Sequence, residues 1–160
     1  MLASTAPPQP WYSYRQDRSP NYVVRQTDGR QTLKWATAAV PKDWAHVRVT
    51  FVWAGGIGWR SQPGGGHFSL SLNGKRVLDF PFVQKTTSWR NEDRSAELRY
   101  VVRRTVGEDS LGLFFLTVPA SRIGPGRSAE LAVTGTAQNS QRWFAVSPYT
   151  DVTAREGAVY

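Results

Sequence analysis

The chain has 160 residues, no cysteine, and 20 Lys plus Arg against 12 Asp plus Glu, which gives a formal net charge of +8. This length fits one domain, and 40% hydrophobic with 20% charged residues is an ordinary globular composition that argues against wholesale disorder and against a membrane protein. The lack of cysteine excludes disulfides, thiol nucleophiles and thiolate metal sites.

Residues 1–20 hold four of the ten prolines and no periodic apolar pattern, so we expect an N-terminal lead-in or linker. Residues 21–150 alternate short β-branched and aromatic runs with turn-forming residues, which predicts one all-β domain, an antiparallel β-sandwich. Residues 151–160 are assigned to a C-terminal tail. The predicted strands lie near Tyr22–Gln26, Thr32–Ala38, His46–Trp53, Phe68–Leu72, Arg76–Phe80, Thr86–Trp89, Glu97–Arg104, Leu111–Val118, Ala129–Thr134 and Arg142–Val146.

The strongest local signal is Asn73-Gly74 between two apolar runs, because this pair suits the two positive-φ positions of a type I′ hairpin turn. After Pro119 the sequence predicts one short helical turn. No alternation of strands with helices exists, which argues against a nucleotide-binding α/β fold.

A glycine-rich segment over residues 53–67 predicts a long, shaped loop, because glycine lets the backbone bend sharply or approach a ligand closely. Its Gly55-Gly56-Ile57-Gly58 run invites comparison with phosphate-binding loops. No Gly-Lys-Ser/Thr sequence follows and no helix begins there, so we reject a nucleotide site.

Tryptophan and arginine occur side by side three times, and an indole can stack on the apolar face of a sugar while arginine pairs with its anionic groups. Trp35, Trp44 and Trp53 have apolar neighbours and are assigned to packing. The candidate ligand-binding residues are Trp59, Arg60, Gln62, His67, Trp89, Arg90, Asn91, Arg99, Arg142 and Trp143.

No catalytic or metal-binding set stands out. Neither His46 nor His67 has a ligand partner at a metal-site spacing, and no nucleophile-elbow motif is present, so no catalytic residue and no cofactor is assigned. If the chain were a polysaccharide lyase, its candidate catalytic residues would be His67, Arg99 and Tyr100, and a glycosidase would use two carboxylates. Nucleic-acid binding ranks third, because basic and acidic residues are interspersed along the chain.

The run Val49–Gly56, followed by Phe68–Phe80 with its Leu72-Asn73-Gly74-Lys75 hairpin, resembles the jelly-roll accessory domains of bacterial carbohydrate-active enzymes. The resemblance implies a jelly-roll sandwich, a covalently linked catalytic domain, and an extracellular or periplasmic location. Such domains often carry a structural calcium ion, but no acidic cluster in this sequence indicates one.

The sequence therefore predicts a non-catalytic carbohydrate-binding module for an acidic polysaccharide, belonging to a larger secreted glycan-degrading enzyme, with no membrane partner. Two alternatives stay open. One is a small polysaccharide lyase or glycosidase, and the other is a structural accessory β-domain without a ligand of its own.

Overall fold

The structure, a computed structural model, describes residues 2–3, 24–25, 32–44, 48–58, 67–81, 83–107, 109–135 and 143–146. Two 3-10 turns, η1 (Lys42–Trp44) and η2 (Ala120–Arg122), are the helical elements of these ranges. The strands are β1 (Leu2–Ala3), β2 (Val24–Arg25), β3 (Thr32–Ala36), β4 (Arg48–Gly58), β5 (His67–Leu72), β6 (Lys75–Pro81), β7 (Thr87–Arg90), β8 (Glu97–Val106), β9 (Asp109–Pro119), β10 (Glu130–Gly135) and β11 (Trp143–Val146).

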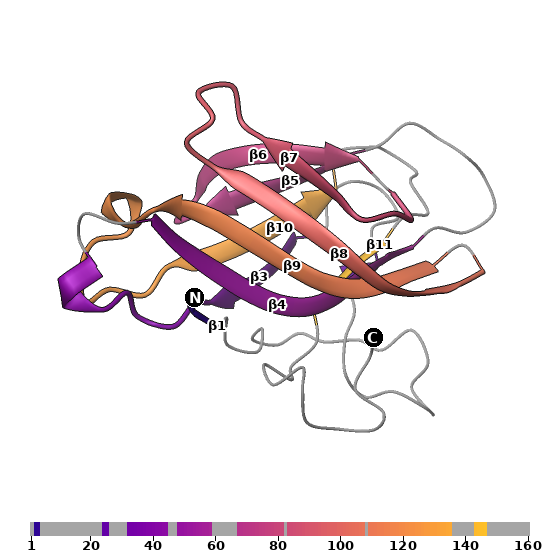
Figure 1. Cartoon of the computed structure of the whole chain (residues 1–160), viewed down its shortest axis with the longest axis horizontal. Helices are drawn as coiled ribbons and strands as arrows, with labels where there is room; N and C mark the ends of the chain where they lie inside the picture. Colours follow the sequence, from indigo (N-terminus) through magenta and orange to yellow (C-terminus); the bar gives the residue numbers. More distant parts are fainter. Residues whose placement is uncertain are drawn as a thin grey trace.

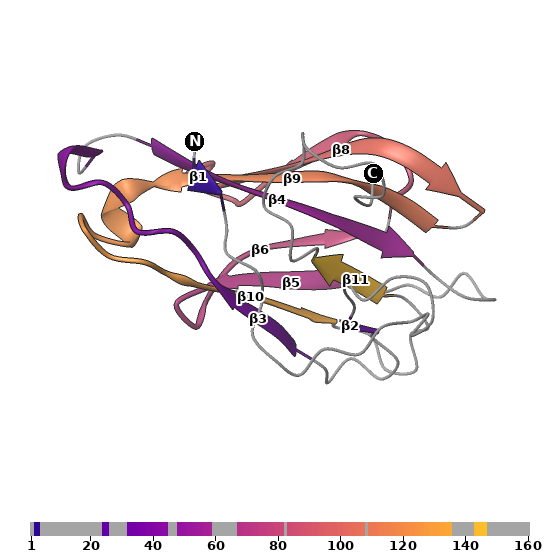
Figure 2. The same ribbon diagram turned by 90° about the horizontal axis from the view of Figure 1, so that it is seen from below.

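The strands form two sheets that lie face to face (Figures 1 and 2). The larger sheet has the order β2-β11-β4-β9-β8-β7, with β1 added beside β4, and the smaller sheet has the order β3-β10-β5-β6. Pairing is antiparallel throughout except between β1 and β4. The all-β, two-sheet architecture predicted from the sequence is therefore confirmed, and each of the ten predicted strand regions contains a strand.

Four of the antiparallel pairs are nested along the chain. β5 pairs with β6, β4 with β9, β3 with β10, and β2 with β11, so each of these pairs encloses the one before it along the chain. The β7–β8 hairpin interrupts this nesting and extends the larger sheet beyond β9. Successive nested pairs alternate between the two sheets, which brings distant parts of the chain into one core.

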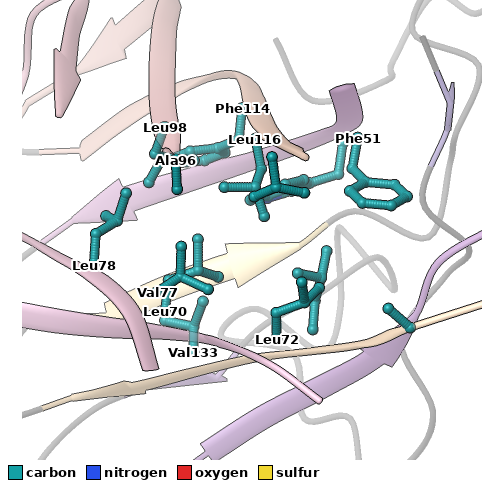
Figure 3. Packing of buried hydrophobic residues seen from close by; sticks show 14 of the residues in the cluster. Phe51, Leu70, Leu72, Val77, Leu78, Ala96, Leu98, Phe114, Leu116 and Val133 are labelled. Carbon is teal, nitrogen blue, oxygen red and sulfur yellow. The ribbon is translucent and has the colours of Figure 1, made fainter. Parts of the chain in front are cut away.

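The core lies between the sheets, and alternate residues of β3, β5 and β9 enter it. Leu98, Phe114 and Leu116 of the larger sheet face Leu70 and Val133 of the smaller one (Figure 3). Burial of this alternating apolar set is the main force that holds the sheets together.

Aromatic rings fill the part of the core near β11. The rings of Trp35 and Trp53 meet edge to face at 5.3 Å, and Phe144 lies 5.1 Å from Phe114. Trp35 and Trp53 are buried and Trp44 packs partly buried against the core, so the assignment of these three tryptophans to packing is confirmed.

The Asn73-Gly74 hairpin is confirmed, with φ angles of 51° and 74° at the two turn residues. The turn is also tied to the neighbouring strand, because the Asn73 N–H donates to the Glu130 carbonyl at 2.8 Å and the Asn73 Oδ1 accepts from the Glu130 N–H at 2.8 Å. The short helical turn predicted after Pro119 is confirmed as η2.

The prediction of a loop over residues 53–67 is wrong for its first part. Residues 53–58 continue β4, where Gly55 pairs with Gly112 of β9 on one side and with Val146 of β11 on the other. Ladder pairing on both edges outweighs the low strand propensity of glycine. Residues 59–66 lie outside the described ranges.

No helix in the described ranges is long and apolar enough to cross a bilayer.

Candidate anion-binding groove

The outer face of the larger sheet carries the polar half of the strand alternation. In β8 the side chains of Leu98 and Tyr100 point into the core and are fully buried, so Glu97 and Arg99 point outward. In β9 the buried residues Phe114 and Leu116 leave Phe115 and Thr117 on this same outer face, both half-buried.

A shallow hollow of ≈ 630 Å³ lies on this outer face, and we call it the outer groove. Four arginines from β4, the β7–β8 hairpin and β8 line it, against one carboxylate, that of Glu97. The arginines are Arg48, Arg90, Arg94 and Arg99. The outer groove therefore has a strong excess of positive charge.

Two cross-strand rows of side chains form the floor of the outer groove. In one row Glu97 lies opposite Thr117, which in turn lies opposite Thr50, and the two threonine hydroxyls are hydrogen-bonded at 2.9 Å. In the other row Arg99 lies opposite Phe115. The floor thus combines hydrogen-bonding hydroxyls with one partly exposed aromatic ring beside a guanidinium.

The four arginines differ in what already engages them. Arg90 pairs with Glu97 at 2.9 Å, and Arg48 donates to the Ser95 carbonyl at 2.9 Å. Neither Arg94 nor Arg99 has an ion-pair partner within the described ranges. These two guanidiniums therefore have the most donors left for an anion.

The turn between β7 and β8 holds Arg94 in an unusual backbone conformation. Its φ of 54° is in the left-handed region, which costs most non-glycine residues energy. Around it, the Asn91 carbonyl accepts from the Arg94 N–H at 3.0 Å and Asn91 Oδ1 accepts from the Ala96 N–H at 2.9 Å. The turn is thereby fixed by its own hydrogen bonds.

Asp93 completes this turn. Its carboxylate accepts hydrogen bonds from the side chain and the backbone N–H of Ser95, the latter at 2.8 Å, and the Arg122 guanidinium lies 3.7 Å away. These hydrogen bonds, with a smaller effect from the positive charge of Arg122, hold the pKa of Asp93 below 3.8.

A second hollow of ≈ 500 Å³ lies between β6 and the same turn. It has mixed charge, because Arg76 and Asp79 form an ion pair on one side of it and Glu92 and Asp93 approach from the other. This hollow lacks the one-sided charge of the outer groove.

The structure brings only some of the predicted ligand residues together. Arg90 and Arg99 both line the outer groove, and Asn91 lies beside it in the turn. Trp89 faces the other side of the sheet from Arg90, is half-buried, and packs on Phe80 with ring centroids 5.3 Å apart.

His67, another predicted ligand residue, is exposed at the start of β5 in the smaller sheet. The backbone of Trp143 lies in β11. Trp59, Arg60, Gln62 and Arg142 lie outside the described ranges, so the proposed role of these residues stays a prediction.

The three candidate lyase residues, His67, Arg99 and Tyr100, do not form one exposed site. Tyr100 is fully buried, donates to Ser110 Oγ at 3.0 Å, and has its pKa raised to about 12 by burial. Arg99 points to the opposite face of β8. A tyrosine inside the core cannot remove a proton from a polysaccharide bound on the surface.

Within the described ranges, no three His, Asp or Glu side chains gather in a way that would hold a metal ion.

Seven residues of the outer groove are absent from the set of ligand residues predicted from the sequence. They are Arg48, Thr50, Arg94, Glu97, Val101, Phe115 and Thr117. Strand alternation in residues 46–51 and 111–118 does indicate which of them face outward. That these outward positions adjoin one another depends on the strand order, for which the sequence carries no local signal.

Comparison with protein-family models, with curated proteins and with solved structures finds no match to this chain.

Proposed function

We propose that this chain is a non-catalytic binding domain for an acidic polysaccharide, and that the ligand lies in the outer groove. The domain would serve a larger secreted glycan-degrading enzyme by holding it on its substrate outside the cell. Arg94 and Arg99 would pair with carboxylate or sulfate groups, and Phe115 would contact the apolar face of a sugar ring.

The observation that carries this proposal is the charge balance of the outer groove. Four arginines meet one carboxylate, and that carboxylate is already paired with Arg90, so the charge of the other three is not neutralised by an acid of the groove. A concentration of guanidinium groups on one face attracts a polyanion and orients its planar anionic groups. The shallow, open shape suits a chain that passes across the sheet.

We also propose jelly-roll connectivity. A jelly roll is a pair of Greek keys in two sheets, equivalent to one long antiparallel hairpin rolled on itself. The nested pairs β2 with β11, β3 with β10, β4 with β9 and β5 with β6 support this assignment. In a jelly-roll connectivity, the β7–β8 hairpin would be an insertion that widens the larger sheet. This hairpin contributes three of the four groove arginines, Arg90, Arg94 and Arg99.

Calorimetric titration of the purified chain with polygalacturonate, a sulfated glycan and a neutral dextran tests the function. We expect binding to the acidic polymers that weakens as salt rises, because exposed charges are screened over about 8 Å at physiological ionic strength. We expect no release of reducing sugar from any of the polymers. Salt-insensitive binding to dextran, or product release, would overturn the proposal.

Two substitutions test the location of the site. The double variant Arg94→Ala, Arg99→Ala removes the two groove guanidiniums that have neither an ion pair nor a hydrogen bond with the described residues. We expect it to weaken binding to the acidic polymer by about 100-fold or more, at 1.5–3 kcal/mol per charged hydrogen-bonding group. The double variant Lys75→Ala, Arg127→Ala is the matched control, since it removes the same charge and both residues are exposed and do not line the outer groove. Equal weakening by both would show that net charge, and not the groove, binds the ligand.

A further inference from the structure

Glu97 is the one acidic side chain among the residues that line the outer groove. Its side chain is 30% exposed, and its Oε2 accepts from Arg90 Nε at 2.9 Å. Its other oxygen, Oε1, accepts no hydrogen bond from the described residues. A carboxylate with one open oxygen therefore lies within a cluster of arginines.

Such a carboxylate acts differently on two kinds of polyanion. It only accepts hydrogen bonds, so it repels a ligand that offers nothing but negatively charged acceptors, such as inorganic polyphosphate. A polyuronate also carries hydroxyl groups, and each hydroxyl can donate a hydrogen bond to the open carboxylate oxygen. For the polyuronate, a charge-assisted hydrogen bond offsets the repulsion.

The neighbours of Glu97 fit a hydroxyl-bearing ligand. Thr117 lies directly opposite it on β9, and the hydroxyl of Thr117 is bonded to that of Thr50 at 2.9 Å, which leaves acceptor capacity on this pair. In the next row, the half-buried ring of Phe115 lies opposite Arg99, so an apolar surface and an anion-binding group are adjacent. Hydroxyl-accepting, stacking and anion-pairing groups thus share one small area.

We infer that Glu97 sets the specificity of the outer groove, favouring polyanions that carry hydroxyl donors, the acidic glycans, over phosphate polymers that carry none. This inference rests on the proposed function, because it concerns the same groove. Glu97 is a specificity-determining residue here, and the affinity itself comes from the arginines.

The test compares the wild-type chain with Glu97→Gln against two probes, polygalacturonate and inorganic polyphosphate, at one salt concentration. The amide removes the charge and keeps an acceptor oxygen in the same place. We expect polyphosphate to bind about ten-fold more tightly to the variant, the effect of one unit charge several ångströms from the ligand in a partly solvated site. Binding of polygalacturonate should change by less than about three-fold, because lost repulsion and a weakened hydroxyl contact oppose each other.

Glu130→Gln is the matched control. Glu130 is an exposed carboxylate paired with Lys34 at 3.1 Å on the smaller sheet, so its removal changes the net charge equally and leaves the groove intact. If Glu97→Gln shifts both probes by the same factor, or if Glu130→Gln shifts the ratio as much, the inference is overturned. A wild-type chain that binds polyphosphate and not polygalacturonate would instead refute the proposed function itself.

Discussion

Gly112 offers the sharpest test of the packing that supports the groove. It lies in β9 opposite Val102, where the register of β8 shifts between Val102 and Arg104. A Cβ added at Gly112 would lie 2.1 Å from the Val101 carbonyl oxygen and 2.9 Å from its carbonyl carbon. Both are backbone atoms, so a side-chain rotation cannot relieve the clash, and β8 must move away from β9 by roughly 1 Å.

Gly112→Ala should therefore be severe. Overpacking costs about 1–3 kcal/mol, and each ladder hydrogen bond that the displacement breaks adds about 1 kcal/mol. We expect a loss of about 3–5 kcal/mol in the free energy of unfolding. For a chain of this size, that corresponds to a fall of about 6–20 °C in melting temperature, at 2–4 °C per kcal/mol.

Urea and thermal unfolding followed by circular dichroism measure this loss, with Gly107→Ala as the control. A Cβ at Gly107 meets nothing within 4 Å, so only its φ of 58° opposes alanine, at a cost of about 1–2 kcal/mol. If Gly112→Ala is no more destabilising than Gly107→Ala, the tight bulge between β8 and β9 is refuted.

Three further predictions concern Tyr100 and the β7–β8 turn. The raised pKa of Tyr100, about 12 against 10.0, means that its contribution to stability is full below pH 10 and falls by about 2 kcal/mol as pH rises to 12. Urea midpoints over this range should show a smaller fall in Tyr100→Phe, and an unchanged fall would contradict the assignment. The lowered pKa of Asp93 means that the stabilisation by its carboxylate is present above pH 3.8 and is lost as pH falls through the pKa of the folded state. Acid unfolding of Asp93→Asn should lack this pH-dependent loss of stability. Identical acid-unfolding curves for the variant and the wild type would contradict the stabilising role of Asp93. Arg94→Gly should leave the melting temperature unchanged or raise it, because glycine adopts a φ of 54° without strain, whereas binding to polygalacturonate should weaken. A variant that binds polygalacturonate normally would show that Arg94 takes no part in binding.

Much of the fold follows from local patterns in the sequence. Asn73-Gly74 fixes one hairpin through its positive φ angles, and alternation in residues 46–51 predicts that Val49 and Phe51 enter the core. The segment Trp53–Gly58 was misjudged because its strand conformation comes from pairing with β9 and β11, which are distant in sequence. The local sequence of a glycine run does not predict pairing with strands that are distant along the chain.

The residues of the outer groove are harder to predict from the sequence than the fold is. Adjacent residues of a strand face opposite sides, so Trp89 and Arg90 could have been separated by alternation alone: Trp89 packs on Phe80 and Arg90 lines the outer groove. The convergence of Arg48 with Arg99 depends on β9 lying between β4 and β8. That order is a property of the whole sheet, and short-range sequence patterns do not encode it.

The most direct test of acidic-polysaccharide binding in the outer groove is a titration of isotope-labelled protein with a short oligogalacturonate, followed by the backbone amide resonances. We predict that the largest shifts occur at Arg94, Arg99 and Thr117, with a dependence on salt, and that Lys34 and Arg76 of the smaller sheet stay unchanged. Shifts confined to the smaller sheet, or no shifts at saturating ligand, would contradict the assignment of this groove.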